Sequence, residues 1–477
     1  MKQPARLGLS RRSLLRNAGF GGGVLALGPL AARLAREAEA EPMASQINRK
    51  YNFDAPFNRI GSGCWKWDGA LRDEHMTRIV AGMGIADMDF RCGPFITIAL
   101  AERVRYENWG YIDMRSAQAS AFIQSIIAWN KRRHGIQVIT PENLAFTTGV
   151  HAGLMDALRA LSPAGGKVLM LAPAYVGFYE DLAASRMIAN ESPMKITNGQ
   201  YEIDWNDLER RMTPDTRVTI LCNPHNPVGR VWSRAELMRY GELCLKHKVV
   251  VLSDEIHCDF VTRGHKYIPF STLDNAKVVN NSITFKSTSK SFSLGSINLA
   301  WYFTTNKDLF REVQSYDRTL TDIPALSIAA ANAAYESGED WLNQLAAYID
   351  GNHDFVDQYV KANIPMIKLG AKPQGTFLRW LDVSPVAERI GAQKIAEAES
   401  RKPQPQSIDT ATRKPYIVSP EDIVGHWFAK NAFVALDPGS IYGLGGTGHM
   451  RMNIATSRNT LKAALDSIAI ATRKISS

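Results

Sequence analysis

Cysteine is scarce in this chain of 477 residues, and its five cysteines are scattered rather than paired. None of them has the short spacing of a zinc site, and their odd number does not fit a complete disulfide framework. The ten histidines include no H-E-x-x-H motif either. We therefore expect no metal site, and we interpret Cys222 and Cys258 as buried, inert thiols.

Long hydrophobic runs are also absent after the first forty residues. No later segment reaches the roughly 18 consecutive apolar residues that a membrane span requires. We therefore expect the mature protein to be soluble, without stable insertion into a membrane. A hydrophobic content of 45% and a charged content of 22% are ordinary for a soluble globular protein, and the length suits two domains.

A basic surface for nucleic acid is missing as well, although the formal net charge is +9. The first forty residues contain seven Lys and Arg and two Glu, so they supply +5 of that charge. The rest of the chain carries only +4 and shows no basic stripe interleaved with aromatic residues. We expect no nucleic-acid partner.

The first forty residues have the pattern of a twin-arginine signal peptide. The sequence SRRSLLR starts at Ser10, and a weakly apolar, glycine-rich stretch follows over residues 18–32. Ala38-Glu39-Ala40 offers small residues around a cleavage site. We therefore predict that residues 1–40 are a signal peptide read by the twin-arginine translocation machinery, and that the mature protein is periplasmic or secreted. A chance amphipathic N-terminus is the alternative.

Short apolar strands alternate with helical patterns through the middle of the chain. Strands are predicted at residues 167–171, 218–221, 249–252 and 299–303, and residues 234–246 have helical spacing. This alternation predicts an α/β fold with a mostly parallel central sheet and helices on both faces.

We expect three further segments after the signal peptide. Residues 41–95 form an N-terminal segment that packs on a smaller domain, and residues 96–330 form the large domain. Residues 331–477 form the smaller α+β C-terminal domain. Within it, residues 397–415 are rich in Lys, Arg, Pro, Gln, Ser and Thr, which predicts a mobile insertion.

The sequence GLGGTG at residues 443–448 matches the spacing of a dinucleotide-binding loop. Such a loop joins a strand to a helix early in a βαβ unit and is followed at a set distance by an acidic residue, and neither condition is met here. We interpret it as a flexible loop beside the substrate pocket rather than as a nucleotide site.

Lys290 carries the strongest chemical signal in the chain. It lies in the stretch STSK, just after an apolar run at residues 283–285 that predicts a buried strand. Asp254 ends another predicted strand, about 36 positions earlier. A lysine among small hydroxyl residues, with an acid at a parallel strand end, suits pyridoxal 5'-phosphate (PLP), because this cofactor needs an imine lysine and an acid for its pyridine nitrogen.

Four other positions fit a site at the same edge of the sheet. Asn226 lies in an irregular turn formed by two Asn-Pro pairs, and Tyr175 offers a flat ring after the strand at 167–171. Gly149 precedes a helical run whose first N–H groups could hold a phosphate. Arg451 lies in an apolar strand, where a buried guanidinium needs an anionic partner, and a planar carboxylate matches its fork.

Taken together, these features resemble the class I/II aminotransferases, a family of fold-type-I PLP-dependent enzymes. Within that family the chain is most similar to the branch of cystathionine β-lyases of the maltose-regulon modulator type. The resemblance covers residues 48–460 and is carried by motifs at residues 85–90 (IADMDF), 129–135 (WNKRRHG), 253–257 (SDEIH), 375–382 (GTFLRWLD) and 436–439 (LDPG).

The resemblance implies specific roles for the site residues. Lys290 would form the imine with PLP and later shuttle the Cα proton, while Asp254 would keep the pyridine nitrogen protonated. The other cofactor contacts implied are the ring 3-oxygen partners Asn226 and His257, the stacking ring of Tyr175, and the phosphate-binding Gly149, Val150, Ser287 and Ser289.

Two further roles concern the substrate and a second subunit. Arg451 would clamp the substrate α-carboxylate, and Tyr111 would reach the phosphate bound by a neighbouring subunit, which implies a homodimer. Purely structural roles remain the alternative for His257, Tyr175 and Tyr111.

The chain departs from the family pattern next to the lysine. Asn298 stands where many class I enzymes have a phosphate-binding arginine, and Gly84-Ile85 stands where the lyase branch favours a tryptophan. We expect an exported aminotransferase that acts on an α-amino acid or on the amino-acid moiety of an exported metabolite. The alternative is a carbon–sulfur β-lyase that releases thiol, pyruvate and ammonia, because both reactions start from the same Cα deprotonation. A non-catalytic binding protein with the same fold is a third possibility.

Overall fold

The computed structural model describes residues 49–316, 323–402 and 417–476. The predicted signal peptide at residues 1–40 lies outside these ranges, as does most of the predicted insertion at 397–415. The start of that insertion is described, and residues 397–400 are helical there, because they end the helix α15 (Ala392–Ser400). No helix in the described ranges is both long enough and apolar enough to cross a membrane.

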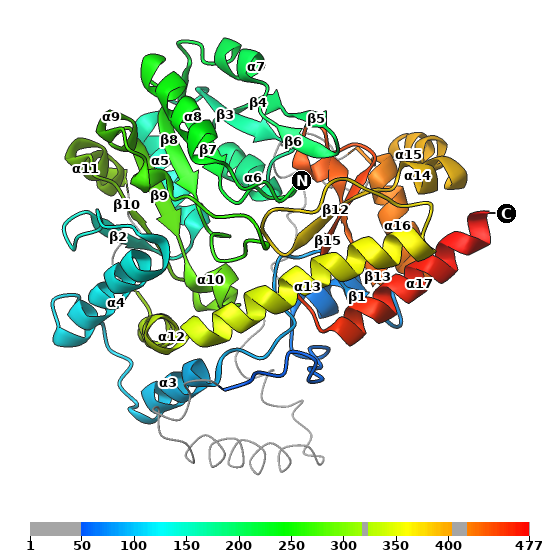
Figure 1. Ribbon diagram of the computed structural model, residues 1–477, viewed down its shortest axis with the longest axis horizontal. Helices are drawn as coiled ribbons and strands as arrows, with labels where there is room; N and C mark the ends of the chain where they lie inside the picture. Colours follow the sequence, from blue (N-terminus) through cyan, green and yellow to red (C-terminus); the bar gives the residue numbers. More distant parts are fainter. Residues whose placement is uncertain (1–48, 317–322, 403–416, 477) are drawn as a thin grey trace, which may run out of the picture. The chain divides into compact units, whose positions relative to one another are not determined.

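A seven-stranded sheet forms the centre of the large domain, with strand order β2-β10-β9-β8-β7-β3-β4 (Figure 1). Its strands are β2 (Leu144–Thr147), β3 (Lys167–Ala172), β4 (Ile188–Pro193), β7 (Thr216–Cys222), β8 (Val250–Asp254), β9 (Ser282–Lys286) and β10 (Ala300–Phe303). The five strands from β9 to β4 are parallel, and β10 runs antiparallel to both of its neighbours. The prediction of a mostly parallel central sheet is confirmed.

Helices cover both faces of this sheet, because its strands are apolar on both sides. Val168 and Met170 of β3 pack in one hydrophobic cluster with α5 (Val150–Leu161), α6 (Val176–Ala184) and α11 (Lys307–Tyr316). Leu169 and Leu171 point to the other face and pack with α7 (Trp205–Arg210), α8 (Arg234–Lys246) and α9 (Ala276–Val279). Alternate residues of a strand point to opposite faces, so this division follows from the pleat.

The boundaries of α8 agree with the helical spacing of the sequence, and its start has a clear local cause. Ser233 caps the helix by accepting a hydrogen bond from the N–H of Glu236, and the Glu236 carboxylate accepts the Ser233 N–H in return. This capping box satisfies two N–H groups that would otherwise lack a partner at the first turn.

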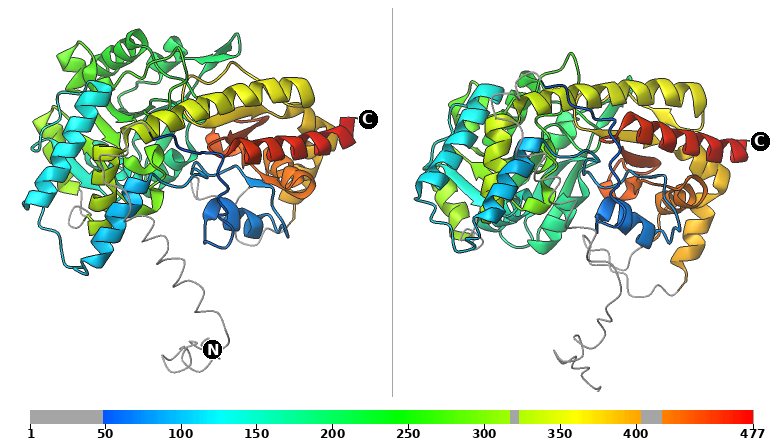
Figure 2. Two further views of the ribbon diagram at one scale, coloured as in Figure 1. Left: turned by 60° about the horizontal axis from the view of Figure 1, so that its bottom comes forward. Right: turned by 90° about the horizontal axis from the view of Figure 1, so that it is seen from below.

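A third helical layer lies at the β2–β10 end of the sheet. It consists of α3 (Pro94–Arg105), α4 (Ala117–His134) and α12 (Ala325–Ser337), which pack around Trp129, Phe292 and Trp301. Helix α13 (Glu339–Asn363) continues from this layer. Its first half packs in the same cluster through Trp341 and Leu345, and its second half packs on the small domain through Val356 and Val360 (Figure 2).

The small domain is built on a four-stranded antiparallel sheet with the order β11-β12-β15-β14. The strands are β11 (Lys368–Leu369), β12 (Leu378–Asp382), β14 (Asp437–Pro438) and β15 (His449–Asn453), and β13 (Val434–Ala435) lies beside them. Helices α14 (Ser384–Ile390), α15, α16 (Pro420–Ala432) and α17 (Arg458–Ser476) complete this domain with the second half of α13.

The N-terminal segment adds to the small domain. Its strand β1 (Ala81–Gly82) pairs in parallel with β13, and its short helices are η2 (Trp65–Gly69) and α2 (Ala70–Asp73). The chain then crosses to the large domain through residues 84–90, which we call the strap. The strap is held from the small domain by Asn453, whose side-chain amide donates 2.7 Å hydrogen bonds to the carbonyl oxygens of Ile85 and Asp87.

Six short elements of the described residues remain in addition to these layers. They are the hairpin β5 (Lys195–Thr197) and β6 (Gln200–Glu202), and the one-turn helices η3 (Phe270–Thr272), α10 (Thr288–Ser291), η4 (Gly295–Ile297) and η5 (Gly439–Tyr442). The GLGGTG loop at 443–448 follows η5 and leads into a strand rather than a helix. Glu191 and Glu421 accept hydrogen bonds from the N–H groups of Leu444 and Gly448, so this loop is tied down rather than free.

Candidate active site

The ends of three parallel strands define the main site of the large domain. Cys222 at the end of β7 pairs in register with Asp254 at the end of β8, and Asp254 pairs with Phe285 of β9. A cavity of about 430 Å³ opens beyond these ends. Ligands of open α/β sheets bind at this edge. The predicted site residues that line the cavity are Gly149, Val150, Tyr175, Asn226, Asp254, His257, Ser287, Ser289 and Lys290.

Lys290 reaches into this cavity from α10, one turn after β9. Its ammonium group donates a 2.7 Å hydrogen bond to the carbonyl oxygen of Ala86 in the strap. Burial first and the positive charge of Arg451 second lower the pKa of Lys290 to about 8. A lysine with such a pKa is partly neutral near physiological pH and can act as a nucleophile or a base.

Asp254 lies on the cavity floor and is fully buried. Its Oδ1 accepts a 3.1 Å hydrogen bond from the N–H of Ile256. Burial raises the pKa of Asp254 to about 6, while the charges of His151 and Lys290 pull it down. A buried carboxylate of this kind gains most from a cationic partner, which the protonated pyridine nitrogen of PLP provides.

The rest of the cavity fits the other parts of PLP. The Nδ1 atom of His257 is buried and has no hydrogen-bond partner in the described part of the chain, and burial keeps the pKa of His257 well below its usual range. Gly149 immediately precedes α5, a Cβ built on it would meet open space, and both Gly149 and Val150 line the cavity. Ser287 and Ser289 add hydroxyl groups there. These donors suit a phosphate.

His151 and Asp181 belong to this site although the sequence reasoning missed them. His151 lines the cavity from the first turn of α5, and its Nδ1–H donates to Asp181 Oδ2 at 2.8 Å. Burial alone lowers the pKa of His151, but the hydrogen bond and the charge of Asp181 outweigh it and raise the pKa. The signal in the sequence was a histidine just after Gly149, in the turn that we expected to hold phosphate.

Arg451 borders the cavity through its neighbour Asn226 rather than lining it. Its Nη1 donates to Asn226 Oδ1 at 3.2 Å, and its Nη2 donates to the carbonyl oxygen of Gly84 at 2.9 Å. The anionic partner expected for a buried arginine lies within the chain itself. It is Asp437, whose Oδ2 is 2.5 Å from Nη2. The sequence contained Asp437 in the motif LDPG but did not indicate this contact.

The strap closes the cavity on the side of the small domain. Ser293 donates a 2.9 Å hydrogen bond to Asp87 Oδ1, and Arg59 forms a 2.5 Å ion pair with Asp87 Oδ2. Asp89 is paired in turn with the buried Lys66 at 2.8 Å. These contacts hold the carbonyl of Ala86 above Lys290.

Two predicted positions differ from the others. Tyr111 does not line the cavity of its own chain, and 91% of its surface is exposed. Asn298, which stands in place of a family arginine, does line the cavity and has the left-handed φ of 53°. The phosphate end of the cavity therefore has polar donors but not the arginine that many class I enzymes place here.

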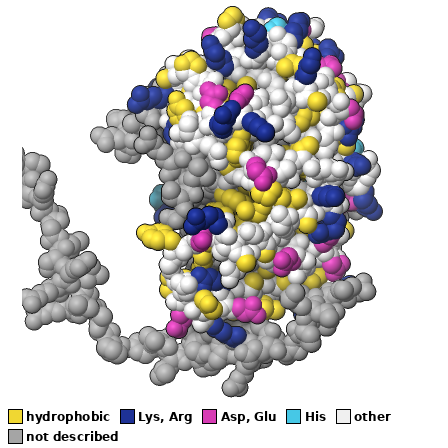
Figure 3. Space-filling model, turned by 90° about the vertical axis from the view of Figure 1, so that its left-hand side faces the viewer, with side chains coloured by type: hydrophobic (Ala, Val, Ile, Leu, Met, Phe, Trp, Pro, Cys, Tyr) yellow, Lys and Arg dark blue, Asp and Glu magenta, His cyan; other side chains and the backbone are white. Residues whose placement is uncertain are grey.

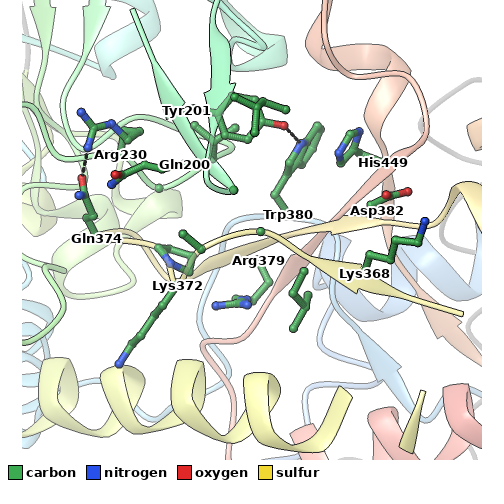
Figure 4. A pocket seen from close by; sticks show the side chains of 18 residues that line it. Gln200, Tyr201, Arg230, Lys368, Lys372, Gln374, Arg379, Trp380, Asp382 and His449 are labelled. Atoms are coloured by element: carbon green, nitrogen blue, oxygen red, sulfur yellow. Dashed lines mark hydrogen bonds between the residues drawn. The ribbon is translucent and has the colours of Figure 1, made fainter. Parts of the chain in front are cut away.

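A second, smaller cavity of about 210 Å³ lies between the β5–β6 hairpin and β12 (Figure 4). Three of its cationic side chains have carboxylate partners: Arg230 pairs with Glu236, Lys372 with Asp350 and Asp354, and Arg379 with Asp357. Its aromatic wall is also engaged. Trp380 stacks on His449 with ring centroids 5.1 Å apart and donates to the Tyr201 hydroxyl. Most of these charged and aromatic groups already contact partners in the described part of the chain.

A cluster of His134, Cys258 and Asp259 brings potential metal ligands within 4.8 Å of one another. Cations already contact two of these three ligands. Arg133 forms a 2.5 Å ion pair with Asp259, and the Lys286 ammonium lies 3.3 Å from Cys258 Sγ. Two adjacent positive charges oppose a metal ion, so we assign the cluster a structural role beneath Ser291 of α10.

The fold and the first cavity together define a PLP-dependent enzyme of fold type I. Comparison with known proteins agrees with this class. The model of the family "Aminotransferase class I and II" matches residues 95–468, and the chain belongs to that family. The resemblance that the sequence motifs indicated, and the cofactor that it implied, are thereby confirmed.

Similar proteins with assigned activities include lyases. The chain is 33% identical to cystathionine beta-lyase PatB of Bacillus subtilis over 425 residues, which cover 88% of this chain and 99% of PatB. It is 26% identical to protein MalY of Escherichia coli over 89% of this chain and 100% of MalY. The PLP-bound C-S lyase from Staphylococcus hominis matches with a TM-score of 0.75 at 27% identity, over 90% of this chain and 100% of the lyase.

Proposed function

We propose that this protein is a PLP-dependent carbon–sulfur β-lyase, which cleaves the Cβ–S bond of a cysteine conjugate and releases a thiol, pyruvate and ammonia. The observation that carries this proposal is the 33% identity to a cystathionine beta-lyase along 99% of that protein's length. From the sequence we expected an aminotransferase and kept the lyase as the alternative. The relatives favour that alternative.

The residues of the first cavity supply what this reaction needs from the protein. Bound PLP supplies the electron sink that stabilises negative charge at the substrate Cα. Lys290, whose pKa is lowered to about 8, accepts the Cα proton at Nζ. Asp254 would hold the positive charge on the pyridine nitrogen, and Arg451, which donates a hydrogen bond to Asn226, would orient the carboxyl end of the substrate.

The strap limits the access of water to Lys290, and the cavity walls determine which bond of the substrate is broken. Ala86 of the strap accepts a hydrogen bond from the Lys290 ammonium, so the strap holds Nζ in place and limits its contact with water. Tyr175 and His151 form one wall, with ring centroids 5.6 Å apart. Which bond at Cα is aligned with the cofactor decides between elimination and transamination.

The decisive experiment uses purified holoenzyme and L-cystathionine without any keto acid. A β-lyase releases free thiol and pyruvate in equal amounts under these conditions. An aminotransferase consumes the substrate only when a keto acid is added, and it forms a new amino acid from that acceptor. Strict dependence on a keto acid would therefore overturn the lyase.

We also propose that the protein is a homodimer in which Tyr111 completes the site of the partner subunit. Tyr111 lies in an exposed apolar stretch with Val104, Tyr106 and Trp109, whose surfaces are 50%, 74% and 58% exposed. Hydrophobic side chains are exposed between charged ones on the face that carries α3 and α4 (Figure 3). Exposed apolar patches of this kind are typical of protein interfaces.

Export by the twin-arginine route is part of the same proposal. Its support is the sequence pattern at residues 10–16 and the small residues at 38–40. Twin-arginine export carries folded proteins, so an enzyme loaded with PLP in the cytoplasm fits this route.

A further inference from the structure

His151 and Asp181 form a hydrogen-bonded pair in the wall of the first cavity. Asp181 Oδ2 accepts the Nδ1–H of His151 at 2.8 Å, and the Asp181 side chain is only 5% exposed. A buried carboxylate that accepts from one ring nitrogen fixes the tautomer and the orientation of a histidine. Nε2 is therefore the atom of His151 that gains or loses a proton.

The Nε2 atom of His151 faces the hydroxyl group of Tyr175. The two atoms are 3.4 Å apart, and the ring centroids are 5.6 Å apart. Hydrogen bonds between catalytic groups are often long before a ligand binds, and they shorten in the complex. Asp181, His151 and Tyr175 thus form a row in which each polar group contacts the next. Tyr175, at the end of this row, lines the cavity.

The fold holds this row in place through the helices α5 and α6. Tyr175 immediately precedes α6, Asp181 lies in the second turn of α6, and His151 reaches across from the first turn of α5. Gly177 makes room for the two rings, because a Cβ built on it would lie 2.3 Å from His151 Cε1 and 2.6 Å from Tyr175 Cε1. A larger residue at this position would displace both rings.

Tyr175 also contacts the part of the site that receives the substrate. Its ring packs against the hydrophobic cluster that contains Tyr442. The Arg451 guanidinium, which would orient the substrate carboxyl group, lies 5.1 Å from the centre of the Tyr442 ring. Lys290 lines the same cavity as Tyr175. The Tyr175 side chain therefore connects His151 with the groups that would surround the substrate.

The charges around His151 favour its protonated form on balance. Burial lowers the pKa of His151, and the charge of Lys290 acts in the same direction. The hydrogen bond and charge of Asp181 and the charge of Asp254 outweigh them, so the pKa is raised. The His151 side chain is 46% exposed. It can therefore regain a proton from water after giving one up.

We propose that His151, held by Asp181, supplies through the Tyr175 hydroxyl the proton that the sulfur leaving group takes up. This inference rests on the proposed lyase activity. As the Cβ–S bond breaks, its electron pair stays on the sulfur. The O–H proton of Tyr175 moves to the sulfur, and the Nε2–H proton of His151 moves to the phenol oxygen. His151 is left neutral and takes a new proton from water.

Lys290 is the competing donor, because it carries the Cα proton once that proton has been removed. The carbonyl oxygen of Ala86 holds Nζ at 2.7 Å, so a proton on Lys290 already has an acceptor. With a second donor at Tyr175, the sulfur does not depend on the proton of Lys290. Loss of His151 should therefore slow the departure of the sulfur without slowing the removal of the Cα proton.

The test compares two cysteine conjugates of similar size whose thiols differ in acidity. Holoenzyme is incubated without a keto acid with S-ethyl-L-cysteine or S-(2,2,2-trifluoroethyl)-L-cysteine, and thiol release is measured. The fluorinated thiolate is stable without a proton, whereas ethanethiolate leaves more readily when it is protonated. In His151→Gln, kcat/KM for the ethyl conjugate should fall roughly tenfold or more beyond that for the fluorinated conjugate.

Two further variants separate proton supply from positioning. Glutamine at 151 keeps an amide that can hydrogen-bond to Tyr175 but cannot release a proton. Tyr175→Phe keeps the ring without the hydroxyl and should show the same change in the substrate ratio, and the double variant should show no further change. His426→Gln is the control, because His426 Nδ1 also pairs with a carboxylate, that of Glu74 at 2.6 Å, outside the residues that line the cavity. It should keep the wild-type ratio.

Exchange in D2O distinguishes the two steps directly. S-ethyl-L-cysteine recovered from His151→Gln should accumulate deuterium at Cα, because Lys290 still removes that proton while the sulfur leaves slowly. Loss of exchange together with thiol release would show a structural role for His151 and would overturn the relay.

The wild type separates this inference from the lyase itself. Thiol release by the wild type, with unchanged substrate ratios in both His151→Gln and Tyr175→Phe, overturns the relay and leaves the lyase intact. A wild-type holoenzyme that releases no thiol from either conjugate overturns the lyase, and the relay with it.

Discussion

The ammonium group of Lys290 donates a hydrogen bond to the carbonyl oxygen of Ala86, at a distance of 2.7 Å. This contact joins the site lysine of the large domain to the strap that comes from the N-terminal segment. The strap is anchored in turn by Asn453 of the small domain. The large domain, the N-terminal segment and the small domain therefore all contribute to positioning the amine of Lys290.

Lys290→Ala should lower activity by roughly three orders of magnitude or more, because it removes both the imine-forming amine and the base. The visible absorbance band of lysine-bound PLP should also be lost. Lys368→Ala, which removes an exposed lysine at the second cavity, is the control and should retain both properties. A Lys290→Ala protein with the wild-type spectrum would contradict the assignment.

The rate of PLP uptake by the cofactor-free protein should rise with pH through a midpoint of about 8. The neutral amine is the nucleophile, and burial first and Arg451 second lower the pKa of Lys290 to about that value. Below the midpoint the amine is protonated and uptake is slow. Stopped-flow absorbance between pH 6.5 and about 9.5 measures this profile. A rate that rises only near the pKa of an exposed lysine would refute it.

Asp254→Asn should stabilise the cofactor-free protein at neutral pH while impairing the holoenzyme. The pKa of Asp254 is raised from 3.8 to about 6 by burial, so the folded state binds the proton more tightly than the unfolded state. Its contribution to stability is present below pH 3.8 and is lost as the pH rises through 6. Removing the ionisable group should therefore gain roughly 2–3 kcal/mol at pH 7.5.

Urea unfolding at pH 7.5 and at pH 4 checks this sign. The stabilisation by Asp254→Asn should be large at the higher pH and small at the lower one, where the wild-type carboxyl is mostly protonated when folded. Activity should fall in the same variant because the pyridine nitrogen loses its anionic partner. A destabilised variant at pH 7.5 would show that Asp254 has another buried cationic partner.

Mixing two inactive variants should restore activity if Tyr111 serves the partner subunit. Lys290→Ala keeps Tyr111, and Tyr111→Ala keeps Lys290, so a mixed dimer has one site with both groups intact. Random reassociation should return about a quarter of the wild-type sites. The mixture should be unfolded and refolded together, with each variant treated alone as the control. No gain on mixing would place Tyr111 in a role within its own subunit.

Replacement of Arg11 and Arg12 by lysine should trap the protein in the cytoplasm. The twin-arginine machinery reads the arginine pair itself, so a change that keeps the positive charge separates recognition from electrostatics. Cell fractionation followed by immunoblotting measures the outcome. Replacement of Arg33 and Arg36 by lysine is the matched control and should still be exported. Periplasmic location of the first variant would disprove the signal assignment.

Local patterns in the sequence were sufficient to predict most of the strands and helices of the large domain. The apolar stretches at 167–171, 218–221 and 249–252 became the parallel strands β3, β7 and β8, because strands buried on both faces are continuously apolar. The stretch at 299–303 also became a strand, but its antiparallel direction was not evident from composition. Strand direction depends on the path of the connecting chain, which short patterns do not encode.

The candidate site was predictable where each residue follows a strand end. Asp254 ends β8, Lys290 and Asn226 come four residues after the ends of β9 and β7, and the parallel sheet brings these strand ends to one edge. His151 was missed because its role depends on Asp181, which lies on a different helix. The phosphate-binding turn around Gly149 was expected, but the histidine beside it carried no local signal of its partner.

The sequence by itself indicated the candidate cofactor lysine, its candidate acid partner and the alternation of strands and helices, since each of these is marked by a local pattern in the chain. Only the tertiary structure decided what surrounds them. Ala86 and Lys290 are 204 positions apart, and Asn226 and Arg451 are 225 apart. The pairing of Arg451 with Asp437 depends on the register of two short strands. Such contacts arise from packing, and packing is a property of the whole chain rather than of any segment.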